Sequence, residues 1–163
     1  MSSDVQDELS TGRKPELDGS GLRIAFACGR FNDVITERLL HGATRRLDEL
    51  GVPSGLIDEV WAPGAFELPL VAKALAESGR YDAVITLGAV IRGGTPHFEY
   101  VAGECAAGVL RVGLDTGVPV VFGVLTVDTV AQAEERSVDG PGNKGAESAE
   151  TAVEMASILR RIR

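Results

Sequence analysis

Short apolar segments alternate with helical patterns along most of the chain, and this alternation is the strongest constraint on its fold. Buried strands are predicted at residues 22–28 (LRIAFAC), 81–87 and 118–124, and a shorter strand at 58–62. Strands that are apolar throughout occur in parallel sheets whose two faces are both covered by helices. The sequence therefore predicts an α/β fold with a four-stranded parallel sheet.

Helical patterns occupy the intervals between these strands. Leu40, Ala43 and Leu47 recur at spacings of three and four, which indicates one face of a helix that ends at Gly51. Further helices are expected at residues 66–78, 96–115, 130–137 and 144–162. The polar segment 1–21 is interpreted as an arm or a short edge strand, and residues 22–163 as a single domain.

Charge and cysteine content limit the partners of this domain. The net charge of −8 over 163 residues would repel a phosphate backbone, so no nucleic-acid partner is expected. Cys28 and Cys105 have no paired spacing and are expected to be reduced core residues. With two histidines and two cysteines in the whole chain, we predict no transition-metal site.

Hydropathy gives an expectation for the compartment. Residues 1–21 contain no apolar stretch of the kind found in secretory signals, and no run of ~18 apolar residues follows. We therefore expect a soluble, cytoplasmic protein without a membrane partner.

A glycine-rich segment after the third predicted strand is the first candidate binding loop. Ligands of parallel sheets bind beyond the carboxyl ends of the strands. Residues 88–100 read GAVIRGGTPHFEY, and Pro96 suits a first helical position, which would make Thr95 the N-cap. Gly94 and Thr95 are therefore predicted to bind an anion such as phosphate. The alternative is a plain capped turn.

His97 is the candidate for proton transfer. It falls in the first turn of the following helix, whose positive end disfavours the imidazolium form, so a neutral ring is expected. A neutral imidazole beside an anion site can shuttle protons. His41, on a helix without such a setting, is interpreted as a surface residue.

The other loops at this edge of the sheet carry weaker signals. Phe31 could stack on a flat heterocycle or pack beneath the next helix. Glu67 could bind hydroxyl groups or complement a helix dipole. Arg136 and Lys144, on either side of a compact turn, could hold a phosphate or be solvated surface charges. The sequence contains no Walker lysine motif, no GxGxxG and no Ser-His-Asp set with elbow spacing.

Taken together, these segments resemble the lumazine synthase family of riboflavin biosynthesis. The matching pieces, in the family's order, are GRFN at 29–32, PGAFELP at 63–69, GAVIRGGTPHFEYV at 88–101, FGVLTVDT at 122–129 and GNKGAE at 142–147. The resemblance implies a flavodoxin-like three-layer αβα sandwich. It also implies condensation of 5-amino-6-(D-ribitylamino)uracil with 3,4-dihydroxy-2-butanone 4-phosphate to 6,7-dimethyl-8-ribityllumazine, with no metal or redox cofactor.

The same resemblance implies a role for each candidate residue. His97 would transfer protons, Phe31 would stack on the pyrimidine, and Glu67 would bind the ribityl hydroxyls. The butanone phosphate would be held by Gly94, Thr95 and Arg136. The remaining residues implied to contact the ribitylaminouracil are Ala65, Phe66, Ala89, Val90, Ile91, Phe122 and Lys144. Phe122, Arg136 and Lys144 would come from a neighbouring subunit.

The resemblance further implies a homopentamer with active sites at subunit interfaces. Some members of the family assemble into icosahedral shells of pentamers, and association with riboflavin synthase is a further expectation. The compact turn at 137–143 and an N-terminal arm that could add an edge strand favour a shell.

Three other functions remain open on the sequence. A flavin-binding module would purify as a yellow protein with stoichiometric flavin. A catalytically silent scaffold would form no lumazine from the two substrates. An enzyme that dismutates lumazine would make riboflavin from lumazine alone.

Overall fold

The computed structural model describes residues 9–163 as a parallel α/β sandwich. Four strands form one sheet in the order β2-β1-β3-β4, and all neighbouring pairs are parallel. This order, with the first strand inside the sheet, is that of the flavodoxin-like class. The strands are β1 (Ile24–Gly29), β2 (Ile57–Ala62), β3 (Ala83–Ile91) and β4 (Val120–Val127).

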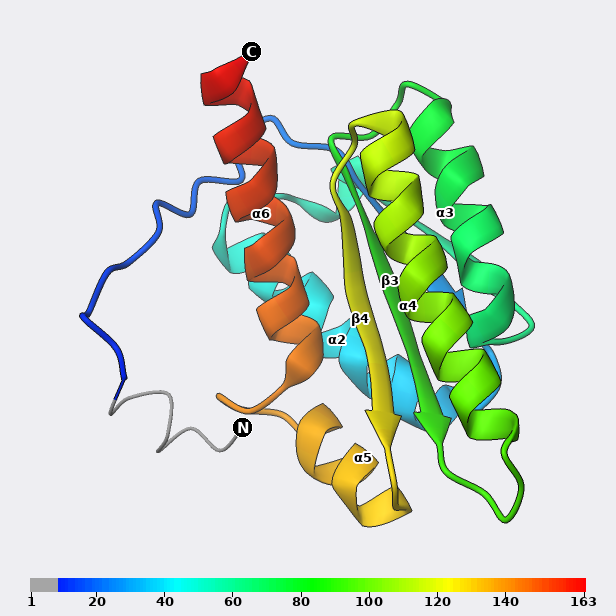
Figure 1. The fold of residues 1–163 in the computed structure, drawn as a ribbon. Helices are drawn as coiled ribbons and strands as arrows, with labels where there is room; N and C mark the ends of the chain where they lie inside the picture. Colours follow the sequence, from blue (N-terminus) through cyan, green and yellow to red (C-terminus); the bar gives the residue numbers. More distant parts are fainter. Residues whose placement is uncertain (1–8) are drawn as a thin grey trace.

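Helices cover both faces of the sheet, as the alternating pattern predicted. Figure 1 shows α6 and α2 on one side of β3 and β4, with α3 and α4 on the other. Two separate apolar clusters fill the interfaces, and Phe26 and Ile85 belong to one while Ala27 and Val84 belong to the other. The helices are α2 (Asp33–Glu49), α3 (Leu68–Glu77), α4 (His97–Thr116), α5 (Val130–Ser137) and α6 (Lys144–Ile162).

The predicted ends of two strands were wrong, and one correction affects the site. β3 continues to Ile91, so residues 88–91 are strand and not loop. These residues pair with β4, from Gly88 with Val124 to Ile91 with Val127. Hydrogen bonds to the neighbouring strand β4 extend β3, and local sequence does not reveal that neighbour. β4 likewise begins and ends later than predicted, because it follows β3 to this end of the sheet.

Two helix starts also differ from the prediction. The segment expected to open a helix at residue 66 is a 3-10 turn, Ala65–Glu67, and α3 begins after it at Leu68. The helix expected at Pro96 begins at His97, with Pro96 as its N-cap and no capping side chain. Thr95 is therefore not the N-cap.

The described part of the N-terminal segment, residues 9–21, is an arm. Residues 9–21 contain no strand, so any edge strand within residues 1–8 lies outside the described residues. Gly19 anchors the end of the arm, since its N–H donates to the Leu50 carbonyl at 2.7 Å. Among the described residues, no helix combines the length and apolarity needed to cross a bilayer.

Candidate active site

The sheet opens at one end because β1 and β3 separate there. Their pairing stops at Cys28 with Leu87, whereas β1 stays paired with β2 as far as Gly29, and β3 stays paired with β4 as far as Ile91. The arrowheads of β3 and β4 in Figure 1 point to this end. A crevice at such a strand-order reversal is where ligands of doubly wound sheets bind.

A cavity of about 560 Å³ occupies this crevice. The loop after β1, the 3-10 turn, the end of β3 and the first turns of α4 all contribute to it. Among the predicted site residues, the cavity is lined by Phe31, Ala65, Phe66, Glu67, Ala89, Val90, Ile91, Thr95 and His97.

The end of β3 offers backbone groups to this cavity. Val84 and Arg92 both donate their N–H groups toward β4, to Pro119 at 2.8 Å and to Val127 at 2.9 Å. Backbone groups alternate sides along a strand, so those of Ala89 and Ile91 face the side that β1 has left. A planar heterocycle with amide-like edges can hydrogen-bond to strand groups on this side, where the Ala89 carbonyl already accepts one hydrogen bond, from the Asn32 side chain.

The loop after β1 presents Phe31 at the mouth of the cavity. The Phe31 side chain is 74% exposed, and its backbone N–H donates to the Pro63 carbonyl at 3.0 Å. Thr36, fully buried, donates its hydroxyl to the Gly29 carbonyl at 2.9 Å. These bonds hold the loop while leaving the ring free, so Phe31 does not pack beneath the helix.

Asn32 is a site residue that sequence reasoning missed. It lines the cavity and has a left-handed backbone, with φ 63°. Its side-chain amide donates to the Ala89 carbonyl at 2.9 Å, across the gap between β1 and β3. Asparagine is enriched at left-handed positions, so its place just before a helix was the available signal.

The glycine-rich loop brings Thr95 and His97 to the same cavity. Gly93, Thr95 and His97 line the cavity, and all three are exposed. Gly94 lies between Gly93 and Thr95 but is not part of the lining. A Cβ at Gly94 would meet no atom within 4 Å, so packing within the chain does not require glycine there.

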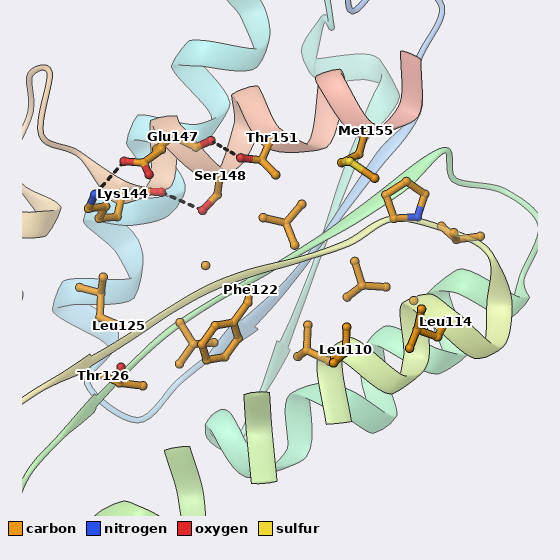
Figure 2. Close-up of a pocket in the computed structure, with 18 of the residues that line it drawn as sticks. Leu110, Leu114, Phe122, Leu125, Thr126, Lys144, Glu147, Ser148, Thr151 and Met155 are labelled. Atoms are coloured by element: carbon orange, nitrogen blue, oxygen red, sulfur yellow. Dashed lines mark hydrogen bonds and ion pairs between the residues drawn. The ribbon is translucent and has the colours of Figure 1, made fainter. Parts of the chain in front are cut away.

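Three predicted site residues lie elsewhere, along the outer edge of β4. Phe122, Arg136 and Lys144 line a groove of about 770 Å³ between α4 and α6. In Figure 2, Leu110 and Leu114 approach this groove from α4 and Met155 approaches from α6, with Phe122 on the strand between them. Within one chain the predicted site is therefore divided between two cavities.

The charged side chains of the groove already have partners within the chain. Lys144 Nζ lies 2.8 Å from a carboxylate oxygen of Glu147. Arg136 donates to the Gln132 carbonyl at 3.0 Å and lies 3.6 Å from Glu135. Both side chains remain partly exposed, so these contacts leave them accessible to an anion.

Arg92 is the second residue that sequence reasoning missed. Its guanidinium donates to Asp128 at 2.8 Å, pairs with Glu99 and lies over the Phe98 ring, 4.3 Å from the centroid. The hydrogen bond from Arg92 holds the pKa of Glu99 below its ordinary value of 4.5. No sequence motif indicated this cluster, because its members come from three separate elements.

The described residues contain no group of three histidine, cysteine or carboxylate side chains able to hold a metal ion. The lining of the 560 Å³ cavity includes aromatic, carboxylate, imidazole and backbone groups. Such a lining can orient a heterocycle and an anion and can transfer protons.

The chain thus has a flavodoxin-like α/β fold with a crevice at the reversal of strand order, where proteins of this class bind small molecules. The model of the 6,7-dimethyl-8-ribityllumazine synthase family matches residues 21–160. The chain therefore belongs to the lumazine synthase family, whose members are transferases of riboflavin biosynthesis.

Proposed function

We propose that this protein condenses 5-amino-6-(D-ribitylamino)uracil with 3,4-dihydroxy-2-butanone 4-phosphate to form 6,7-dimethyl-8-ribityllumazine. The observation that carries the proposal is the convergence of Phe31, Glu67 and His97 on one cavity. Family membership supports the same reaction.

The pyrimidine binds against Phe31, with its polar edge along the end of β3. Stacking needs an exposed ring held at a constant position. The loop after β1 is held by backbone hydrogen bonds and leaves the Phe31 ring exposed. The backbone groups of Ala89 and Ile91 bind the uracil edge. Val90, Ala65 and Phe66 complete the surface around it, and the exposed carboxylate of Glu67 accepts hydrogen bonds from the ribityl hydroxyls.

The butanone phosphate binds on the side of the glycine-rich loop. Backbone N–H groups at a helix start attract anions, and Gly94 and Thr95 precede Pro96, the N-cap of α4. A neighbouring subunit supplies Arg136, which can form two parallel hydrogen bonds to phosphate, together with Phe122 and Lys144.

His97 moves the protons in three successive steps. The 5-amino group attacks the ketone, and loss of water leaves an imine. Loss of a proton from carbon then expels inorganic phosphate. The elimination leaves an enol, which tautomerises to a new ketone with a methyl group. The ribitylamino nitrogen attacks this ketone, and loss of a second water closes the ring. Orientation of the two fragments can contribute up to ~7–11 kcal/mol, and proton transfer about 10²–10⁴-fold in rate.

The working form is a homopentamer in which each cavity meets the β4 groove of the next subunit. Exposed apolar side chains on that groove, including Leu114 at 76%, support an interface there. We further propose that the pentamers assemble into an icosahedral shell, which light scattering would detect as a far larger particle than a pentamer.

The proposal is tested by mixing the two substrates and following lumazine absorbance. His97→Ala should lower kcat by about 10²–10⁴-fold while leaving both KM values nearly unchanged. His41→Ala is the matched control, because His41 lies on α2 outside the cavity, and it should keep full activity. Absence of lumazine formation by the unmodified protein would overturn the proposed function. Near-native turnover of His97→Ala would overturn only the role of His97.

A further inference from the structure

One arginine joins three elements around the glycine-rich loop. Arg92 directly follows β3, and its backbone N–H donates to the Val127 carbonyl at the end of β4. Its Nε donates to Asp128 at 2.8 Å, just beyond β4, and its Nη1 pairs with Glu99 in the first turn of α4. The guanidinium plane also lies over the Phe98 ring. The two ends of the loop are thus tied to β4 through a single side chain.

The loop itself has little else to hold it. Among the described residues, one backbone hydrogen bond outside regular elements involves residues 93–96. The Glu99 N–H donates it to the Pro96 carbonyl, inside the first turn of α4. The helix has no capping side chain, and Cβ atoms at Gly93 and Gly94 would meet nothing within 4 Å. Glycine pairs without packing neighbours have wide conformational freedom.

We propose that Arg92 is a positioning residue that holds the loop of residues 93–97 in its phosphate-binding conformation. The inference rests on the proposed function, because it concerns the loop assigned there to the phosphate. Arg92 does not line the cavity, so it acts through Thr95 and His97. Its effect should fall mainly on the phosphate substrate, because the proposed function places the pyrimidine against Phe31 and the end of β3 and not on the loop.

Charge gives Arg92 a second effect on the same substrate. Asp128 and Glu99 carry two negative charges close to the loop, and Arg92 neutralises part of them. Without the guanidinium, both carboxylates would repel an incoming phosphate. Lysine can replace the charge but not the planar group that binds two carboxylates and stacks on a ring.

Steady-state kinetics of the intact oligomer test the proposal. In Arg92→Met, the KM for the butanone phosphate and the inhibition constant of inorganic phosphate should both rise about tenfold, an affinity change of ~1.4 kcal/mol. The KM for the pyrimidine should change by less than about twofold, and Arg92→Lys should recover part of the loss. Arg45→Met is the control, since Arg45 forms an exposed ion pair with Glu49 within α2 and does not line the cavity.

Hydrogen exchange gives a readout that does not depend on activity. The amides of Arg92 and Glu99, which donate at the two ends of the loop to the Val127 and Pro96 carbonyls, should exchange faster in Arg92→Met than in the unmodified protein, with no change in β1. Adding Asp128→Asn to Arg92→Met should cause little further acceleration, because the link is already broken. Unchanged exchange in this loop, or equal rises in both KM values, would overturn the positioning role. If the unmodified protein forms no lumazine, the proposed function fails while exchange still tests the link.

Discussion

At the scale of single residues, Asn32 carries two functions that can be separated by substitution. Its left-handed backbone starts α2, and its amide links the loop of Phe31 to the end of β3. Asn32→Gly keeps the backbone conformation and loses the hydrogen bond, whereas Asn32→Ala loses the bond and strains the turn.

We expect Asn32→Gly to lower the free energy of unfolding by about 1 kcal/mol and Asn32→Ala by about 2–3 kcal/mol. Both should raise the KM for the pyrimidine, because the Phe31 loop loses its bond to β3. Urea unfolding and steady-state kinetics measure the two effects. Equal stability of the two variants would show that strain in the left-handed backbone conformation does not contribute to the free energy of unfolding.

The two cysteines give a prediction about reactivity. Both are buried free thiols, as the sequence predicted. Burial raises the pKa of Cys28 to about 12, with a further contribution from Glu59 and Glu37, and burial raises the pKa of Cys105 to about 11. A raised pKa keeps a thiol protonated until the pH approaches that value, so little thiolate forms below about pH 10.

Accordingly, the folded protein should not react with Ellman's reagent at pH 8, and two thiols per chain should react after unfolding in guanidinium. Rapid reaction of either thiol in the folded protein at pH 8 would contradict this account.

At the scale of elements, the contact between α2 and α6 depends on glycine. A Cβ at Gly145 would lie 1.9 Å from the Leu39 carbonyl oxygen, and a Cβ at Gly42 would lie 2.2 Å from the Asn143 side chain. Asn143 itself is buried, and its side chain accepts from the Ala146 N–H and so caps α6. Backbone atoms cannot move aside as a flexible side chain can, so Gly145 is the more restrictive position.

Gly145→Ala should therefore push the two helices apart and destabilise the protein by about 2–3 kcal/mol. Gly103→Ala is the control, because Gly103 is an exposed residue of α4 with no atom within 4 Å of its Cβ. That change should stabilise the protein by about 0.5–1 kcal/mol. Thermal unfolding measures both effects. An unchanged stability of Gly145→Ala would show that α2 and α6 can move apart without loss of stability.

At the scale of the whole molecule, the division of predicted site residues between two cavities has a direct consequence. His97 lines one cavity and Arg136 the other, so one chain does not bring them together. In the proposed pentamer, an active site needs His97 from one subunit and Arg136 from the next.

Subunit mixing should therefore restore activity. His97→Ala and Arg136→Ala should each be nearly inactive alone. After dissociation and reassembly of a one-to-one mixture, about a quarter of the sites should combine an intact His97 with an intact Arg136. Lumazine absorbance measures the recovery. No recovery in mixed oligomers, verified by native mass spectrometry, would rule out a shared site.

Much of this architecture followed from the sequence because the signals are local. Apolar runs such as residues 22–28 identify strands buried on both faces, and helical spacing ending at Gly51 identifies α2. The motifs 63–69 and 88–101 indicated the family without knowledge of any contact. Hydrophobic periodicity and turn residues act within a few positions, so a single chain segment displays them.

Tertiary structure alone decided where β3 ends and which residues tie the site together. Hydrogen bonds to β4 carry β3 on to Ile91, Asn32 reaches Ala89 across 57 positions, and Arg92 meets Asp128 across 36. Each of these depends on a partner that lies far away in the chain. Local patterns specify which segments form strands and helices, whereas distant contacts set the geometry in which their side chains meet.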